Sequence, residues 1–152
     1  MKDQNRDPAH ELYLRALELE AADRKAARAA YESCLAGDCR HLEARINLGR
    51  LLHLEGLHGD AERIYRDTQE SDATLHFNLA VLMEDKGCCA EAMQLYREAI
   101  LLDPGMADAH FNLSILLEQK GDPQSAYRHL LAYHRLIEAH KAPDEFDDNS
   151  SE

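Results

Sequence analysis

The four-residue sequence HFNL occurs twice in this chain, at residues 76–79 and again at residues 110–113. The same spacing of 34 residues separates Gly87 from Gly121, so the two copies belong to a longer periodic pattern. A fixed period of about 20 to 50 residues indicates repeats that each form one small unit and bury a core only by stacking. The sequence therefore predicts a stack of similar units.

Aligning the chain on this period gives four segments, at residues 8–41, 42–72, 73–106 and 107–140. Each segment contains two helical patterns, in which apolar residues recur with the spacing of one face of an α-helix. The two patterns are joined by a tight break, where a glycine such as Gly87 favours the end of a helix. We therefore expect an all-α fold of four helix pairs, about eight helices in total.

Small residues recur at two positions of the period, where they would let neighbouring helix backbones approach closely. One position holds an alanine in every segment and the other a small residue in three of them: Ala27, Ala61, Ala92 and Ala126; Gly49, Ala80 and Ser114. With a closing Asp-Pro pair, this pattern resembles the tetratricopeptide repeat family. The third segment, ATLHFNLAVLMEDKGCCAEAMQLYREAILLDPGM, matches almost throughout, with His76 where the family usually has Trp. The resemblance covers residues 8–140 and implies a right-handed α-solenoid of four helix-turn-helix repeats.

Two segments depart from the pattern. The first has Arg15 where a small residue is expected and Glu18 where an apolar one is expected, so its opening helix must pack differently or expose these charges. The second is three residues shorter and lacks the Asp-Pro pair. This predicts an irregular step from the second repeat to the third, just before Ala73. Outside the repeats, we expect residues 1–7 and the acidic tail at 141–152 to be disordered.

The charge of the chain limits its partners. A formal charge of −12 repels phosphate backbones and anionic lipid and attracts basic partners. No apolar run approaches the roughly 20 residues that cross a bilayer, and the N-terminus is polar where a signal peptide has an apolar stretch. The four cysteines lack the spacing of a zinc or redox motif. We expect a soluble cytoplasmic protein that binds neither nucleic acid nor membrane.

No catalytic or nucleotide-binding motif stands out, since GxSxG, HExxH, P-loop and GxGxxG patterns are all missing. Nine histidines are scattered along the chain, and His76 and His110 fall on the packing face of first helices. His134 and Glu138 are four residues apart on a helix and could hold a metal only weakly. The sequence predicts no enzymatic activity, no metal and no cofactor, and an enzyme or metal-binding protein is the least favoured alternative.

Asn47, Asn78 and Asn112 occupy one position in three first helices, a position that lines the concave groove in the tetratricopeptide repeat family. An amide offers a donor and an acceptor together, so a row of them could hold the backbone of an extended peptide. Similar asparagine ladders occur in the repeat region of the O-linked N-acetylglucosamine transferase. The alternative is that each asparagine bonds within its own helix.

Neighbouring register positions supply the rest of the predicted groove. Its apolar members suggest apolar anchors on the partner, and its acidic members suggest basic residues beside them. These further groove residues are Ile46, Arg50, Phe77, Val81, Glu84, Asp85, Phe111, Ile115 and Glu118. The alternative is that Phe77 and Phe111 cover the core of their own helix pairs. The favoured function is a scaffold or adaptor that binds a peptide or partner segment in this groove.

One familiar use of the fold is disfavoured by the sequence. Adaptors that bind the C-terminal carboxylate of heat-shock chaperones resemble one another in two lysines, an arginine and two asparagines spread over three first helices. On the first three segments the corresponding positions hold Leu12, Ala16, Asn47, Thr74 and Asn78, and the cations are missing. An acidic chaperone tail is therefore a poor ligand for this groove.

The last helix presents an end surface of Leu131, Tyr133, Leu136 and Ile137, although terminal repeats normally need a polar outer face. A homodimer through this helix, a docked partner, or coverage by Phe146 would each shield these apolar side chains from water. The rival function is a regulatory or oligomerisation module that acts through this end face. LEARINLGRLLH is loosely similar to repeat regions attached to some bacterial helix-turn-helix regulators, but this chain has no such DNA-binding segment.

Overall fold

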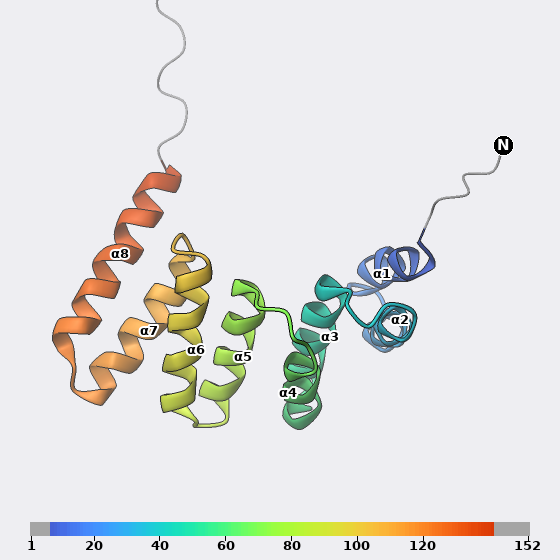
Figure 1. Cartoon of the computed structure of the whole chain (residues 1–152), viewed down its shortest axis with the longest axis horizontal. Helices are drawn as coiled ribbons and strands as arrows, with labels where there is room; N and C mark the ends of the chain where they lie inside the picture. The colour runs from blue at the N-terminus through green and yellow to red at the C-terminus, as the bar shows by residue number, and fades with distance from the viewer. Residues whose placement is uncertain (1–6, 142–152) are drawn as a thin grey trace, which may run out of the picture.

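The computed structural model describes residues 7–141, and all regular secondary structure in this range is α-helical. Its helices form four pairs that follow one another along the long axis of the molecule (Figure 1). The expected all-α fold of four helix pairs is thereby confirmed. Residues 1–6 and 142–152, for which we expected disorder, lie outside the described residues. The helices are α1 (Pro8–Leu19), α2 (Arg24–Gly37), α3 (Leu42–Leu54), α4 (His58–Arg66), α5 (Ala73–Asp85), α6 (Cys89–Leu102), α7 (Ala107–Lys120) and α8 (Pro123–Lys141).

Asp-Pro pairs begin the first and last helices. The side chain of Asp7 accepts a hydrogen bond from the backbone N–H of Ala9 at 3.0 Å, and the proline that follows takes the first helical position, where its missing N–H costs nothing. Asp122 accepts from the backbone N–H of Ser125 at 3.1 Å at the start of α8. In the structure, Asp7 caps α1, and α8 ends at Lys141.

Glycine ends the first helix of the third and fourth repeats. Gly87 and Gly121 have φ angles of +77° and +87°. This left-handed conformation is unfavourable for residues with a Cβ atom but is open to glycine. The chain can therefore end the helix at these glycines and reverse direction within two or three residues. The predicted break at Gly87 is confirmed.

Three tyrosines at one register position occupy the centre of the core. Tyr31, Tyr65 and Tyr96 are each at most 1% exposed. The second repeat differs because a Cβ atom added to Gly49 would overlap the ring of Tyr65, whereas the equivalent residue of the third repeat, Ala80, carries one. Glycine therefore lets the Tyr65 ring pack unusually close to the α3 backbone.

The first repeat is shifted by one residue relative to the predicted frame. Ala16, not Arg15, is the small buried residue of α1, with no exposed surface. The rings of Tyr13 and Tyr31 lie 6.1 Å apart, as those of Phe77 and Tyr96 lie 5.8 Å apart in the third repeat. The expectation that Arg15 stands at the small-residue position was wrong, and the repeat has a normal close-packing residue after all.

The irregular step after the second repeat is confirmed. α4 has nine residues, whereas α2 and α6 have 14 each, and residues 67–72 connect α4 to α5 without regular structure. The guanidinium of Arg45, 3% exposed, donates to the carbonyl oxygens of Ile64 at 3.0 Å and Cys39 at 2.7 Å. These bonds supply donors to a carbonyl group near the end of the short helix and to one in the loop between α2 and α3.

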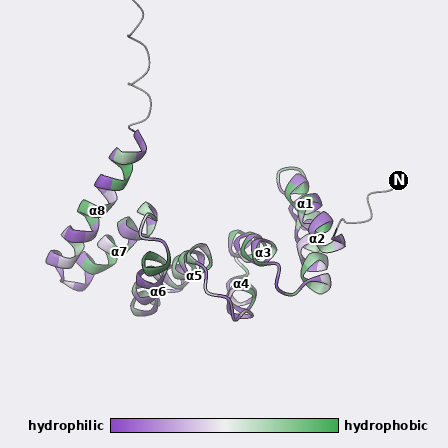
Figure 2. Cartoon of the chain, turned by 45° about the horizontal axis from the view of Figure 1, so that its top comes forward, coloured by the Kyte–Doolittle hydropathy of each residue, from purple (hydrophilic) through white to green (hydrophobic). Residues whose placement is uncertain are grey.

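The two ends of the stack have different surfaces. On α1, Arg15 and Glu18 are exposed and joined at 3.2 Å; in the shifted frame they match Leu48 and Leu51, which are buried in α3. On α8, apolar and polar residues alternate along the helix (Figure 2), and Tyr127 is 60% exposed. At these two positions the N-terminal end therefore has the polar groups that terminal repeats need, beside Leu14 and Leu17, which are 47% and 41% exposed, whereas the outer surface of α8 is mixed. Within residues 7–141, every helix is too short or too polar to cross a membrane.

Candidate functional site

The first junction between repeats is joined by a polar relay that runs through three side chains. The hydroxyl of Tyr31, on α2, donates to the carboxylate of Glu20 at 2.5 Å and accepts from the amide of Asn47 at 3.2 Å. The carboxylate also accepts from Arg50 at 2.5 Å. Asn47 is thus bonded to the preceding repeat and not within its own helix.

The same relay recurs at the third junction. The hydroxyl of Tyr96 donates to Glu84 at 2.8 Å and accepts from the amide of Asn112 at 3.1 Å. Burial raises the pKa of both Tyr31 and Tyr96 above the usual value near 10, and the hydrogen bond to a carboxylate raises it further. Both phenols therefore keep their protons and act as donors at neutral pH.

The middle junction lacks this relay. Among the described residues, Asn78 has no hydrogen-bond partner for its side chain, and the hydroxyl of Tyr65 has none either. His53 replaces the acidic residue of the relay and instead contacts Asp85 across the junction, at 2.7 Å. Asn78 is therefore the one asparagine of the predicted ladder whose amide is uncommitted within residues 7–141.

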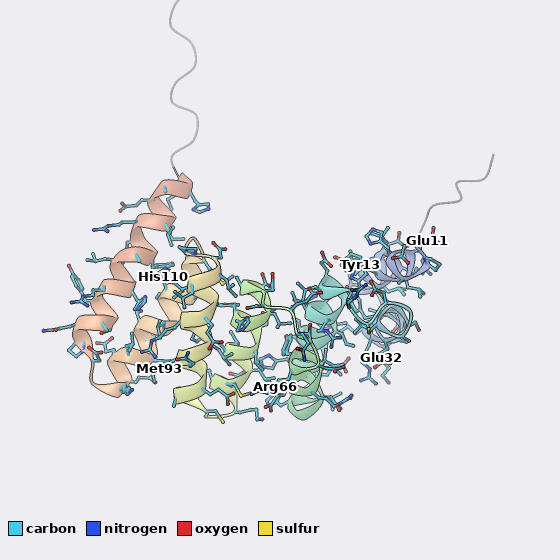
Figure 3. The ribbon with its side chains drawn as sticks, viewed as in Figure 1. Glu11, Tyr13, Glu32, Arg66, Met93 and His110 are labelled. Atoms are coloured by element: carbon cyan, nitrogen blue, oxygen red, sulfur yellow. The ribbon has the colours of Figure 1, made fainter. Side chains whose placement is uncertain are left out.

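A second set of contacts joins this junction away from Asn78. The guanidinium of Arg66, which reaches from α4 toward the third repeat (Figure 3), contacts Glu62 at 2.9 Å and Glu91 at 2.6 Å. Lys86 forms an ion pair with Glu62. The hydrogen bond from Lys86, followed by that from Arg66, lowers the pKa of Glu62. The polar contacts that cross the middle junction are thus mostly ion pairs of partly exposed side chains.

A cavity of about 500 Å³ lies at the middle junction, next to the uncommitted amide. It brings together five predicted groove residues and four others. Its lining consists of Arg50, Phe77, Asn78, Val81 and Asp85, with His53, Leu54, His58 and Tyr65. Leu54 is 61% exposed, so the wall includes apolar surface in contact with solvent. Its volume falls within the range of about 300 to 1,000 Å³ of ligand pockets, and it is open to solvent rather than enclosed.

Phe111 and Ile115, the predicted apolar groove residues of the fourth repeat, do not line this cavity. Phe111 is 39% exposed and Ile115 is 37% exposed, so neither side chain is fully buried in the core. The ring of Phe111 contacts that of Tyr133, with centroids 5.0 Å apart. Phe77 is half-buried against Tyr96. Both phenylalanines therefore combine a packing role with some remaining surface.

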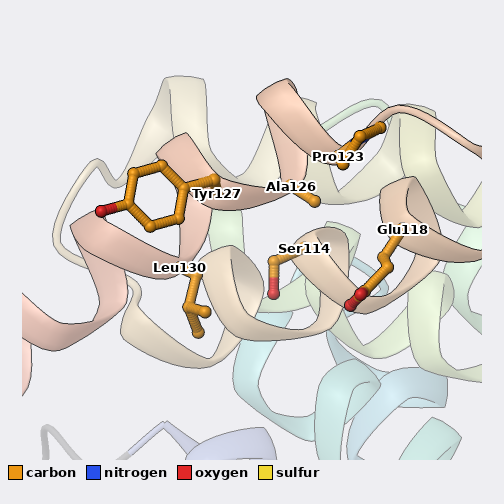
Figure 4. A pocket seen from close by; sticks show the side chains of 6 residues that line it. All are labelled: Ser114, Glu118, Pro123, Ala126, Tyr127 and Leu130. Atoms are coloured by element: carbon orange, nitrogen blue, oxygen red, sulfur yellow. The ribbon is translucent and has the colours of Figure 1, made fainter.

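The end of the stack carries a smaller hollow of about 180 Å³ between α7 and α8 (Figure 4). Tyr127 and Leu130 form its apolar side, and Glu118, expected to line the groove, lies on its rim. The predicted end-face residues Leu131, Tyr133, Leu136 and Ile137 are all half-buried. Tyr127, the most exposed aromatic residue of α8, was not singled out by the sequence analysis.

The histidines make structural contacts. His110 is 8% exposed; its Nδ1 lies 3.0 Å from Nδ1 of His129, and its Nε2 lies 3.3 Å from the carbonyl oxygen of Pro104. Burial, and the neighbouring His110 and Arg97, lower the pKa of His129. In residues 7–141, no three His, Cys, Asp or Glu side chains gather closely enough to hold a metal ion.

Comparisons with solved structures identify the architecture. PilF of Pseudomonas aeruginosa superposes with a TM-score of 0.80 at 15% identity, over 89% of this chain and 70% of PilF. A crystal structure of MamA gives 0.79 at 16% identity, over 89% and 81% of the two chains. A tetratricopeptide repeat protein from Parabacteroides merdae gives 0.74 at 17% identity, over 86% and 54%.

The chain has the tetratricopeptide repeat fold. No protein-family model and no curated protein matches its sequence. The fold typically serves as a scaffold for protein–protein interaction and is usually not catalytic. Because identities of this size speak for the fold alone, any partner must be inferred from the surface of the chain itself.

Sequence reasoning missed the relay, although its elements were visible. Glu20 and Glu84 precede the core tyrosines by 11 and 12 residues, and the asparagines follow those tyrosines by 16. At the middle junction, Asn78 follows Tyr65 by only 13 residues. That shorter spacing was the available sign that its amide would have different surroundings.

Proposed function

We propose that this chain is a protein-interaction scaffold that binds a segment of a partner protein along its first-helix face. We define this face by the apolar, asparagine and arginine residues of α3, α5 and α7 that the sequence analysis assigned to the groove. Its members are Ile46, Asn47, Arg50, Phe77, Asn78, Val81, Phe111, Asn112 and Ile115. The observation that carries the proposal is the partial exposure of apolar side chains at equivalent positions of successive repeats, Phe111 and Ile115 most of all.

The charges near this face favour a basic partner. Glu84 and Asp85 lie at the end of α5, and Glu118 lies near the end of α7. The net charge of −12 adds a long-range attraction for basic segments. Apolar anchors would supply most of the affinity, and acidic residues beside them would select lysine or arginine.

Affinity capture with mass spectrometry tests this proposal. The full chain and a Phe77→Ala/Asn78→Ala variant would be used as baits under the same conditions. We expect the variant to lose a partner that the unaltered chain retains, and the purified partner to bind the chain directly in calorimetry. Circular dichroism checks that both baits are equally folded.

A second candidate function, association through the C-terminal end face, has one observation in its favour. The N-terminal end carries the exposed Arg15–Glu18 pair, whereas the C-terminal end exposes Tyr127 beside half-buried Tyr133. Tyr127→Glu in the same capture experiment discriminates the two sites, because Tyr127 is 60% exposed, whereas Tyr133 contacts Phe111 of the first-helix face. If this change abolishes capture and the Phe77→Ala/Asn78→Ala variant does not, the end face is the binding site and the first proposal is wrong.

A further inference from the structure

We propose that the cavity at the middle junction is the anchor pocket of the first-helix face, and that it takes one large aliphatic or aromatic side chain next to a lysine or arginine in an extended peptide. This inference rests on the proposed function and assigns its binding to one junction out of three. It does not follow from the repeat pattern, which would distribute binding evenly over all repeats.

The pocket exists because three local differences coincide at this junction. α4 is five residues shorter than α2 or α6, since it has nine residues and they have 14. Gly49 lets the ring of Tyr65 pack close to α3, where its hydroxyl makes no bond to Asn78. His53 stands where the relays have a glutamate, and it pairs with Asp85. Together these differences leave the space that Tyr–Asn contacts occupy at the other junctions.

The walls of the pocket suit an apolar side chain. Leu54 comes from the end of α3, and Phe77 and Val81 come from one face of α5. Single exposed leucines are common on protein surfaces, but three apolar side chains from two repeats converge here around one cavity. A side chain that fills it would remove apolar surface of both repeats from water.

Asn78 supplies the polar contact that an extended peptide needs. Its amide can donate to a backbone carbonyl and accept from a backbone N–H at the same time. Asn47 and Asn112 each commit an N–H to a tyrosine hydroxyl, which fixes the orientation of the amide. Asn78 has no such constraint from the described residues, and it lines the cavity directly.

The charged side chains around the pocket favour a basic peptide residue next to the apolar side chain that fills it. The cation of Arg50 is paired with Glu20 at 2.5 Å. On the α5 side, the side chain of Asp85 is 54% exposed while it contacts His53. Asp85 therefore offers a carboxylate to a basic residue that flanks the anchor, whereas the nearest arginine is already compensated.

A display library of random twelve-residue peptides, selected on the full chain, provides a probe that requires no known partner. We expect the enriched peptides to share one large aliphatic or aromatic residue adjacent to Lys or Arg. Fluorescence anisotropy of two labelled enriched peptides then gives their Kd for the unaltered chain and for each variant.

Matched variants locate the binding. Leu54→Gln changes an exposed wall residue of the pocket and should weaken binding about tenfold or more. Leu101→Gln, at a residue that is 80% exposed and outside the cavity lining, should leave Kd unchanged. Asn78→Ala should weaken binding more than Asn112→Ala does, although both remove an asparagine at the same register position, because the amide of Asn112 is already bonded to the hydroxyl of Tyr96.

The possible outcomes distinguish a failure of the proposed groove function from a failure of the anchor pocket alone. Failure to enrich any peptide that binds the folded chain overturns the proposed groove function and this inference together. Peptides whose binding resists Leu54→Gln and Asn78→Ala but is lost on Ile115→Gln overturn the pocket alone and leave the groove function standing. Enriched peptides without an apolar residue next to a basic one also overturn the pocket.

Discussion

The outer junctions of this stack and its middle junction are held together by different means. At the first and third junctions, a glutamate, a buried tyrosine and an asparagine form a directed chain of hydrogen bonds from one repeat to the next. At the middle junction, His53 pairs with Asp85, and Arg66 and Lys86 pair with surface carboxylates. A single repeat architecture can therefore join its repeats by part-buried hydrogen-bond chains at some junctions and by surface ion pairs at another.

This difference has a steric origin as well as a polar one. The ring of Tyr65 is buried as deeply as those of Tyr31 and Tyr96, so the middle junction has lost no core residue. What differs is the direction in which the hydroxyl can find partners, because α3 has glycine at residue 49 and histidine at residue 53. Four predictions test this comparison.

The largest effect is expected at Gly49. Gly49→Ala gives the second repeat the residue that the third has at this position, yet the new methyl group would overlap the Tyr65 ring. We expect a loss of about 1 to 3 kcal/mol in the free energy of unfolding, measured by urea denaturation, because the buried ring must move. Gly59→Ala is the matched control, since a Cβ atom there meets nothing. A stable Gly49→Ala protein would mean that the ring can turn toward Asn78.

Alkaline pH should expose the buried phenols. Burial raises the pKa of Tyr31, Tyr65 and Tyr96 above the usual value near 10. Below pH 10 both states keep the phenolic protons; above it the unfolded state loses them first, so stability falls as pH rises. Each phenol contributes a slope of about 1.4 kcal/mol per pH unit. Because that slope is reached only well above pH 10, Tyr65→Phe should reduce the loss between pH 10 and 11 by about 1 kcal/mol; an unchanged loss would contradict the assignment.

The three tyrosine hydroxyls should differ in their contribution to stability at neutral pH. Tyr31→Phe and Tyr96→Phe each remove a hydroxyl with two hydrogen bonds and should cost about 0.5 to 1.5 kcal/mol. Tyr65→Phe removes a hydroxyl without a bond to any described residue and should be close to neutral. Equal costs for all three in urea denaturation would remove the distinction between the outer and middle junctions.

The smallest effect is expected from the surface ion pairs of the middle junction. Arg66→Ala removes contacts with Glu62 and Glu91, but the arginine side chain is 43% exposed. Exposed pairs contribute little, so we expect a loss of no more than about 1 kcal/mol, which 1 M salt should reduce further. Arg63→Ala, which removes only a long contact with Asp60 on the same helix, is the control. A salt-resistant loss would indicate that this network is more than a surface contact.

The fold could be predicted from the sequence because it follows from local signals that recur. The period, the Asp-Pro starts, the glycine breaks and the alanine positions each appear in several repeats. Even the irregular step was visible as a missing Asp-Pro pair and three missing residues before Ala73. The frame of the first repeat was harder, because Arg15 and Ala16 are adjacent and only packing decides which one faces the core.

The candidate site could be predicted only in part, because equivalent register positions do not have equivalent partners. The ladder of Asn47, Asn78 and Asn112 is regular in sequence, but two of its amides bond to tyrosines and one does not. The fate of each amide depends on where a tyrosine ring of the preceding repeat points, and this depends on Gly49 and on the length of α4. Their binding of a partner peptide stays a prediction.

The exposed Arg15–Glu18 pair gives the stack a direction in which it can be lengthened. Another repeat placed before Pro8 would have to bury both charges at positions where the internal repeats use leucine. A repeat added after α8 would instead cover Tyr127 and Leu130, which are already apolar. For protein engineering, an added repeat would therefore bury an ion pair at the N-terminal end but an aromatic and an aliphatic side chain at the C-terminal end, so the C-terminal end is the better place to add one.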